Sequence, residues 1–312
     1  WEKTATYNIG LDFRLFNNVI SGSLEYYNRQ SSDLLVSRYM DPTMGAKSRK
    51  VNNGEMRNRG VELSLTANIV RKKDWNFAVD FNFDYNKNKM LKVDHSDADN
   101  VSSFIKSPQD YFMEGTSYNT LWAYRITSNS SLKGTDDLVN LGSLTPKFSG
   151  SLAFRLNYKN FDLNAFFVYA GGNKLRNSVV SMSDQIGSQT LKGISNRWSA
   201  DEPDAQVRMY HDMPSQVKTY AGIFEDWWKY GDINVKNAGY VKLRSLSLGY
   251  NLPLTICQHL RLNSLKVKVQ VNNLFTWCKA GSDIDPESYN MNGGTRGMAS
   301  PKTYSIGLST SF

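Results

Sequence analysis

The sequence predicts an all-β protein, an antiparallel transmembrane β-barrel, and three observations lead to this prediction. Apolar and polar residues alternate one by one in nine separate segments, which places them on opposite faces of extended strands. The connections between these segments are alternately short and long. No run approaches the roughly 18 to 20 apolar residues that a membrane helix needs, whereas half of each strand in a barrel wall can be polar.

The first four segments are expected to form two hairpins. These strands are predicted at residues 4–16, 20–27, 59–70 and 75–86. The fourth is the clearest, because mostly asparagine and aspartate alternate with Trp75, Phe77, Val79, Phe81, Phe83 and Tyr85. A core strand of a soluble protein rarely keeps amide and charged side chains on one side over such a length. Aromatic residues at both ends of the apolar stripe match the interfacial girdles of outer-membrane barrels.

The last five segments repeat this design at residues 148–158, 161–169, 240–252, 265–272 and 304–312. In the segment 240–252 the apolar positions change phase after Leu243. This slip near Arg244 and Ser245 predicts a β-bulge. In the final segment small polar residues alternate behind Tyr304, Ile306, Leu308 and Phe312, a pattern typical of the closing strand of a membrane barrel.

The lengths of the connections favour a barrel over a soluble β-sandwich. Short connections are predicted at residues 17–18, 71–74, 159–160 and, somewhat longer, 253–264. Long ones are predicted near residues 30–58, 87–146, 171–238 and 277–301. Outer-membrane barrels have short periplasmic turns and long extracellular loops, whereas a sandwich has no reason to sort its loops in this way. Such barrels have an even number of strands and periplasmic termini, whereas nine strands are predicted here. We therefore expect the chain to be the C-terminal portion of a longer barrel.

Composition adds two exclusions. The net charge of +8 comes from basic residues that are spread over turns and loops, so no stripe of the kind that binds nucleic acid is expected. Cys257 and Cys278 flank one predicted strand, which holds their backbones beyond the roughly 7 Å limit for a disulfide. No disulfide is therefore expected.

Several motifs carry a family resemblance. They are residues 56–93, the sequence GYVKLRSLSLGYNLP at 239–253, VNNLFTW at 271–277 and DPES at 285–288. Arg197-Trp198, with Arg208 downstream, is a further one. Over essentially the whole chain the sequence resembles the SusC/RagA family of TonB-linked outer-membrane transporters of Bacteroidota.

The resemblance implies a barrel of about 22 strands around an N-terminal plug, with the plug and the first strands outside this sequence. It implies a multi-pass protein of the bacterial outer membrane, surrounded by its lipid, that imports an oligosaccharide or a peptide. It also implies a SusD-like surface lipoprotein and the TonB complex as partners. Three alternatives stay open: a passive porin without energy coupling, an enzyme built into a barrel, and a soluble β-sandwich.

No catalytic constellation or cofactor site is expected, because His95, His211 and His259 are scattered. Asp283, Asp285 and Glu287 could bind a hard cation, or they could form a structural turn. The candidate site lies in the long connection 171–238, where aromatic residues could stack on a substrate or pack against the lipoprotein or neighbouring loops. These residues are Trp198, Tyr210, Trp227, Trp228 and Tyr230. Polar residues on the wet side, among them Glu62 and Asp80, are expected to contact the plug and water.

Overall fold

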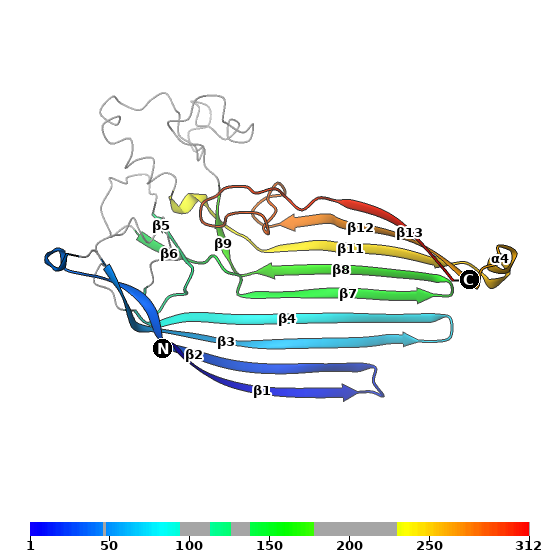
Figure 1. Cartoon of the computed structure of the whole chain (residues 1–312), viewed down its shortest axis with the longest axis horizontal. Coiled ribbons are helices and arrows are strands. Elements are labelled where there is room, and N and C mark those ends of the chain that lie inside the picture. The colour runs from blue at the N-terminus through cyan, green and yellow to red at the C-terminus, as the bar shows by residue number, and fades with distance from the viewer. Residues whose placement is uncertain (46–47, 94–112, 126–137, 178–229, 312) are drawn as a thin grey trace, which may run out of the picture.

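A nine-stranded antiparallel sheet forms most of the structure, a computed structural model that describes residues 1–45, 48–93, 113–125, 138–177 and 230–311. The strands lie in the order β1-β2-β3-β4-β7-β8-β11-β12-β13 (Figure 1). Their bounds are β1 Lys3–Leu15, β2 Ile20–Tyr39, β3 Ser48–Arg71, β4 Trp75–Lys92, β7 Phe148–Tyr158, β8 Phe161–Gly171, β11 Tyr240–Asn251, β12 Ser264–Cys278 and β13 Thr303–Ser311. Each strand therefore pairs with the next one along the main sheet, as in an up-and-down barrel wall.

Smaller elements lie in the connections. Among the described residues, two small antiparallel sheets pair β5 (Thr120–Tyr124) with β6 (Leu138–Ser143) and β9 (Lys174–Arg176) with β10 (Val235–Asn237). In the described part of the chain the helices are η1 (Pro42–Met44), η5 (Asp232–Asn234) and α4 (Leu254–His259). Among the described residues, no helix has the length and apolar character needed to span a membrane.

The predicted strands are present, but the first long connection is wrong in its extent. Residues 30–39 and 48–58, expected to be loop, continue β2 and β3 and pair with each other. Two later strands also run past their expected ends, since β4 reaches Lys92 and β12 reaches Cys278. The predicted bulge is confirmed, because the register of β11 shifts between Leu243 and Ser245 against both of its neighbours.

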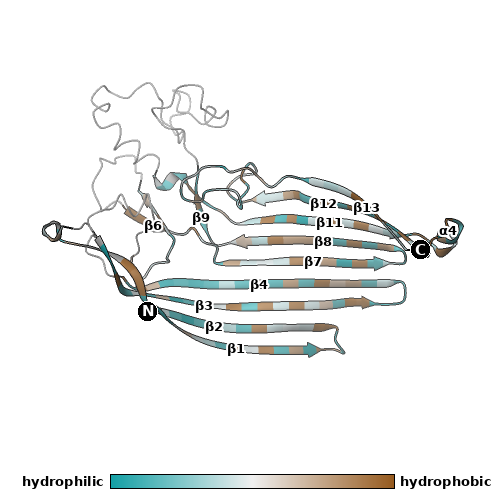
Figure 2. Cartoon of the chain, viewed as in Figure 1, coloured by the Kyte–Doolittle hydropathy of each residue, from teal (hydrophilic) through white to brown (hydrophobic). Residues whose placement is uncertain are grey.

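The register joins residues of one kind into continuous rows across the sheet. One row is entirely apolar: Leu15, Ile20, Ala67, Val79, Phe154, Ala165, Leu246, Val271 and Tyr304. A row on the opposite face is mainly polar: Asp12, Ser23, Ser64, Asn82, Ser151, Val168, Lys242 and Thr276. The alternation of brown and teal along the strands in Figure 2 shows the same pattern. The sheet thus has one apolar face and one polar face.

The apolar face is not covered by a second sheet in the described part of the chain. Ile9, Leu11 and Ile306 are 73%, 61% and 78% exposed, and the two small sheets lie at one end of the large one (Figure 1). On the polar face, cross-strand ion pairs join Arg155 to Asp80 at 2.8 Å and Lys266 to Asp162 at 2.6 Å. This arrangement suits a wall between lipid and a wet interior, and it excludes the β-sandwich alternative for the described residues.

The connections are sorted between the two ends of the sheet, as predicted. Residues 16–19, 72–74, 159–160 and 252–263 join strands at one end, which we call the short-turn end; the last of these contains α4. The remaining connections leave the opposite end, the long-loop end, on the left of Figure 1. Cys257 in α4 and Cys278 at the end of β12 therefore lie at opposite ends, and both are free thiols, so the prediction of no disulfide is confirmed.

Candidate functional site

At the long-loop end, the segment after β12 folds back over the polar face of the sheet. This returning segment comprises residues 279–302. It begins where the Lys279 amide donates to the Gly239 carbonyl at 2.8 Å. It then closes on itself, because the Asn290 amide donates to the Thr295 carbonyl at 2.9 Å and the Gly297 amide donates to the Ser288 carbonyl at 2.8 Å.

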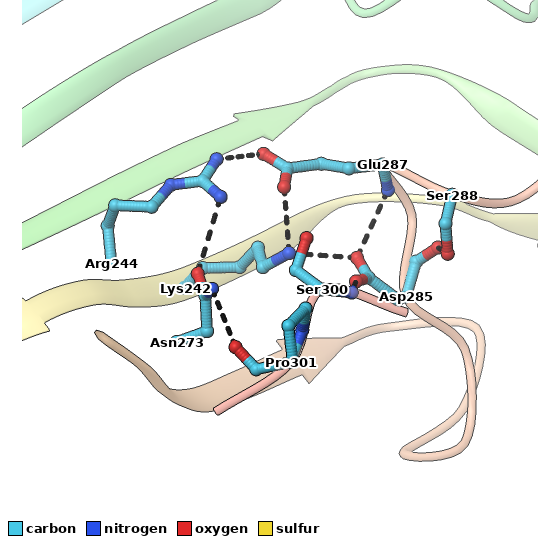
Figure 3. Close-up of polar contacts among 8 residues, drawn as sticks. All are labelled: Lys242, Arg244, Asn273, Asp285, Glu287, Ser288, Ser300 and Pro301. Carbon is cyan, nitrogen blue, oxygen red and sulfur yellow. Dashed lines mark hydrogen bonds and ion pairs between the residues drawn. The ribbon is translucent and has the colours of Figure 1, made fainter. Parts of the chain in front are cut away.

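A buried ionic network holds the returning segment on β11 (Figure 3). The Lys242 ammonium, whose side chain is 1% exposed, lies 2.9 Å from Asp285 Oδ1 and 2.7 Å from Glu287 Oε2. Arg244 Nη2 donates to the other oxygen of Glu287. The amides of Glu287 and Ser300 each donate to Asp285 at 3.2 Å. Every charged group of the network thus has an opposite charge beside it, as a buried ion must.

The same contacts set the ionisation of the two carboxyl groups. Burial alone would raise the pKa of Asp285, but hydrogen bonds from Lys242, Glu287 and Ser300 lower it below its ordinary value. Burial likewise opposes ionisation of Glu287, and the bonds from Lys242 and Arg244 outweigh it, so its pKa is also lowered. Both groups are therefore carboxylates at neutral pH.

The acidic turn supports the structural interpretation and not the cation-binding one. Asp285 and Glu287 face the Lys242 ammonium, while Asp283 pairs with Arg296 at 2.7 Å where both side chains are about half exposed. The three carboxylates therefore do not converge on one point. In the part of the chain that the structure describes, no group of three or more His, Cys, Asp or Glu side chains is arranged to hold a metal ion.

A small apolar core lies beside the ionic network. Its buried members come from β9, from the residue before Gly239, from the end of β12 and from the returning segment: Leu175, Ala238, Cys278, Ala280, Ile284 and Tyr289. This core and the ionic network together fix the returning segment at the long-loop end.

Arg176 at the end of β9 ties three connections together. Its guanidinium donates from Nη2 to the Trp122 carbonyl at 2.8 Å and from Nε to the Asn292 carbonyl at 3.2 Å, and it lies 4.8 Å from the centre of the Tyr230 ring. The Tyr289 hydroxyl donates to the Arg176 carbonyl at 2.9 Å. Burial lowers the pKa of Arg176 to about 10, which leaves it cationic at neutral pH.

Tyr230 is the one predicted site residue that the structure describes; Trp198, Tyr210, Trp227 and Trp228, like His95 and His211, lie outside the described residues. Its half-buried side chain packs against Trp122 beneath Arg176, and its carbonyl accepts a hydrogen bond from the Tyr124 amide at 3.0 Å. This places Tyr230 in the packing between loops, while its contact with a substrate stays a prediction.

The profile of one protein family decides the assignment of the chain. The family described as "TonB dependent receptor-like, beta-barrel" matches residues 1–274. The chain belongs to this family. Because TonB-dependent receptor barrels lie in the bacterial outer membrane, the predicted fold class and localisation are confirmed.

Curated relatives carry the same family name. The sequence is 26% identical over 321 residues to TonB-dependent receptor P3 of Formosa agariphila, covering 92% of this chain and 31% of that protein. It is 24% identical over 339 residues to TonB-dependent receptor SusC of Bacteroides thetaiotaomicron, covering 100% of this chain and 32% of SusC. The chain thus spans about a third of the length of these relatives.

Solved structures show the same fold. The RagAB peptide importer in its closed-closed state aligns with a TM-score of 0.75 at 23% identity, over 100% of this chain and 36% of that one. Its open-open state aligns with a TM-score of 0.73 at the same identity. The sequence-based resemblance to the SusC/RagA type is therefore confirmed.

Sequence reasoning did not single out the cations that organise this TonB-dependent receptor barrel at the long-loop end. For Lys242, strand alternation predicts only that its side chain lies on the polar face. Its carboxylate partners are 43 and 45 residues away, a pairing that no local pattern reveals. Arg176 had no such signal, since β9 is only three residues long.

Proposed function

We propose that the chain forms wall and outer loops of an energy-driven importer that carries an oligosaccharide or a peptide across the outer membrane. The family supports this proposal, as do the names of two relatives: SusC is a TonB-dependent receptor, and RagAB is a peptide importer. In this proposal the chain performs no covalent chemistry and uses no cofactor. It shapes the passage and its outer mouth.

The observation that carries the proposal is that the returning segment is fixed over the polar face of the sheet. The returning segment is held by Lys242 and by the adjacent apolar core, so a rigid surface projects over the interior side of the wall. A binding site for a flexible nutrient benefits from such preorganisation, because less ordering is needed when the nutrient binds.

The partners follow from the same proposal. A SusD-like surface lipoprotein would cover the long-loop end, a plug would fill the interior, and the TonB complex would supply energy through parts outside this chain. In this arrangement the aromatic residues of connection 171–238 contact either the nutrient or the lipoprotein: Trp198, Tyr210, Trp227, Trp228 and Tyr230.

Uptake by cells that carry the full-length protein tests the proposal. Radiolabelled oligosaccharide and peptide mixtures would be offered to cells with and without TonB, and the accumulated label would be measured. We expect accumulation of one class only, and only in cells with TonB. Equal accumulation without TonB would favour the passive porin and refute the importer.

A second measurement addresses the aromatic residues. Trp198→Ala, Trp227→Ala and Trp228→Ala should raise the half-saturating nutrient concentration if these side chains bind the nutrient. If they bind the lipoprotein instead, the lipoprotein should no longer co-purify with the variant. Trp75→Ala is the control, because it removes an aromatic side chain at the short-turn end, away from the connection 171–238.

A further inference from the structure

The outward face of β3 and β4 carries four cations just beyond its apolar rows. Strand alternation continues without a break from Val61 and Tyr85 toward the long-loop end, where Arg59 lies opposite Lys87 and Arg57 lies opposite Lys89. These four residues share the face of Val61 and Tyr85, and we call them the basic patch. In Figure 2 the long-loop ends of β3 and β4 are mostly teal, beyond the brown bands of the membrane-facing part.

The basic patch has no anionic partner within the described chain. None of its members takes part in an ion pair or a side-chain hydrogen bond among the described residues. Arg59 and Lys87 are exposed, and Arg57 and Lys89 are half-buried. Like charges placed directly opposite each other on neighbouring strands destabilise a sheet. Two such pairs in succession indicate that an anion outside the chain offsets their repulsion.

The position of the patch identifies where that anion lies. Tyr26 and Tyr85 precede the patch in the register row of Val61, and both rings are exposed on the face that contacts lipid. Tyrosine marks the boundary between hydrocarbon and headgroups. Two residues along an extended strand advance about 7 Å, so the patch lies at the level of the headgroups and points away from the barrel interior.

We propose that Arg57, Arg59, Lys87 and Lys89 bind the phosphate groups of the glycolipid that forms the outer leaflet of the outer membrane. The long-loop end is the extracellular end by the general rule for these barrels, and phosphorylated glycolipid is the anionic lipid of that leaflet. Arginine binds a phosphate through two parallel N–H donors, while lysine supplies a compact charge. The two arginines on β3 and the two lysines on β4 form a two-by-two array against which a phosphorylated sugar headgroup can lie. This inference depends on the outer-membrane barrel and not on the nutrient that it carries.

Native mass spectrometry of the full-length protein tests the proposal. The protein would be taken from vesicles that contain either phosphorylated glycolipid or the same glycolipid with its phosphates removed, and the bound lipid would be counted. The patch variant carries R57Q, R59Q, K87Q and K89Q. The matched control loses the same number of charges at the short-turn end through K72Q, K73Q, K159Q and R261Q. Heat-modifiable mobility on a gel shows whether each variant is folded.

We expect the parent and the control to retain phosphorylated glycolipid and the patch variant to bind it at least about tenfold more weakly. Removing the phosphates should reduce binding by the parent to the level of the patch variant. Inorganic phosphate alone should not displace the lipid, which would distinguish a headgroup site from a site for free phosphate.

Three results would overturn the proposal. The patch variant could retain the glycolipid as well as the parent does. The control could lose it to the same extent, which would indicate a bulk charge effect. The patch variant could instead keep the lipid and lose a co-purifying lipoprotein, which would assign the patch to a protein partner. If the fourfold variant does not fold, the pair R59Q and K87Q gives the same readout with fewer changes.

Discussion

Replacing Lys242 with methionine should release the returning segment without unfolding the barrel. Methionine has a similar length and no charge, so Lys242→Met leaves Asp285 and Glu287 as carboxylates without their shared cation. The side chains of Lys242, Asp285 and Glu287 are 1%, 10% and 28% exposed. Removing one partner of a buried pair costs roughly 3 to 5 kcal/mol, and Arg244 still offsets part of the charge of Glu287. We therefore expect a cost of about 3 kcal/mol.

Hydrogen exchange measures this cost locally. The amides of Asn290 and Gly297 close the returning segment through hydrogen bonds to Thr295 and Ser288, and they exchange only when the segment opens. A loss of about 3 kcal/mol of local stability corresponds to roughly 100-fold faster exchange. Strand amides of the main sheet should keep their protection, because the pairing of β11 does not depend on the Lys242 side chain.

Two further variants show whether the effect comes from a buried charge. Lys3→Met removes a 76% exposed ammonium that pairs with the 40% exposed carboxylate of Asp33 at 2.9 Å, and an exposed pair of this kind contributes little to stability. Adding Asp285→Asn and Glu287→Gln to Lys242→Met removes the uncompensated charges and should restore part of the protection. Unchanged exchange of Asn290 and Gly297 in Lys242→Met would refute the reasoning, as would an equal effect of Lys3→Met.

Three other predictions concern pH, the lipid face and Arg176. The pKa values of Asp285 and Glu287 are lowered from 3.8 and 4.5. The two carboxylates therefore contribute fully to the stability of the returning segment above these ordinary values, and the contribution is lost as the pH falls through the lowered pKa values. The segment should keep constant exchange protection from neutral pH to about 5 and lose it in stronger acid. Leu65→Arg on the lipid face should cost about 2 to 4 kcal/mol in a refolding titration in lipid vesicles, whereas Ser64→Arg on the polar face should cost little, and equal costs would contradict the assignment of faces. Arg176→Lys keeps the charge but cannot reach two carbonyls in a fixed fork, so exchange at β9 and β10 should rise by about tenfold; unchanged exchange would show that the guanidinium geometry is not needed.

The strands and their faces could be predicted because they depend on local alternation. In β4 every second residue lies on the apolar face, so the period of two follows from the different surroundings that the two faces of a barrel wall have. The extension of β2 and β3 could not be predicted, because beyond the hydrocarbon neither face needs apolar residues and the apolar–polar alternation of the sequence disappears. There the pairing is irregular, with register shifts after Ser31 and after Leu34 and a positive φ of 56° at Asp33. Pairing with the neighbouring strands makes residues 30–39 extended.

The candidate site could be predicted only in part, for a related reason. The sequence indicates that Lys242 faces the interior and that the turn at Asp285 and Glu287 is acidic. It does not indicate that these groups meet, because the free energy that joins them comes from burial by a segment whose own path depends on the contact. For the aromatic residues of connection 171–238, only the surroundings of Tyr230 are described, and the other candidates stay predictions.

The bulge in β11 explains how a regular barrel wall can hold an irregular segment. In an unbroken strand Lys242 and Ser245 would face opposite sides, but both lie in polar-face rows because the register shifts between Leu243 and Ser245. The extra residue, Arg244, reaches Glu287 and also donates to Asn273 Oδ1 at 3.4 Å. Asn273 has a positive φ of 53° and donates to the Pro301 carbonyl at 3.0 Å. Bulges re-aim side chains next to functional sites, and here adjacent irregularities in two strands bind the first and last parts of the returning segment. The bulge that interrupts the alternation of β11 therefore also attaches the returning segment to the sheet.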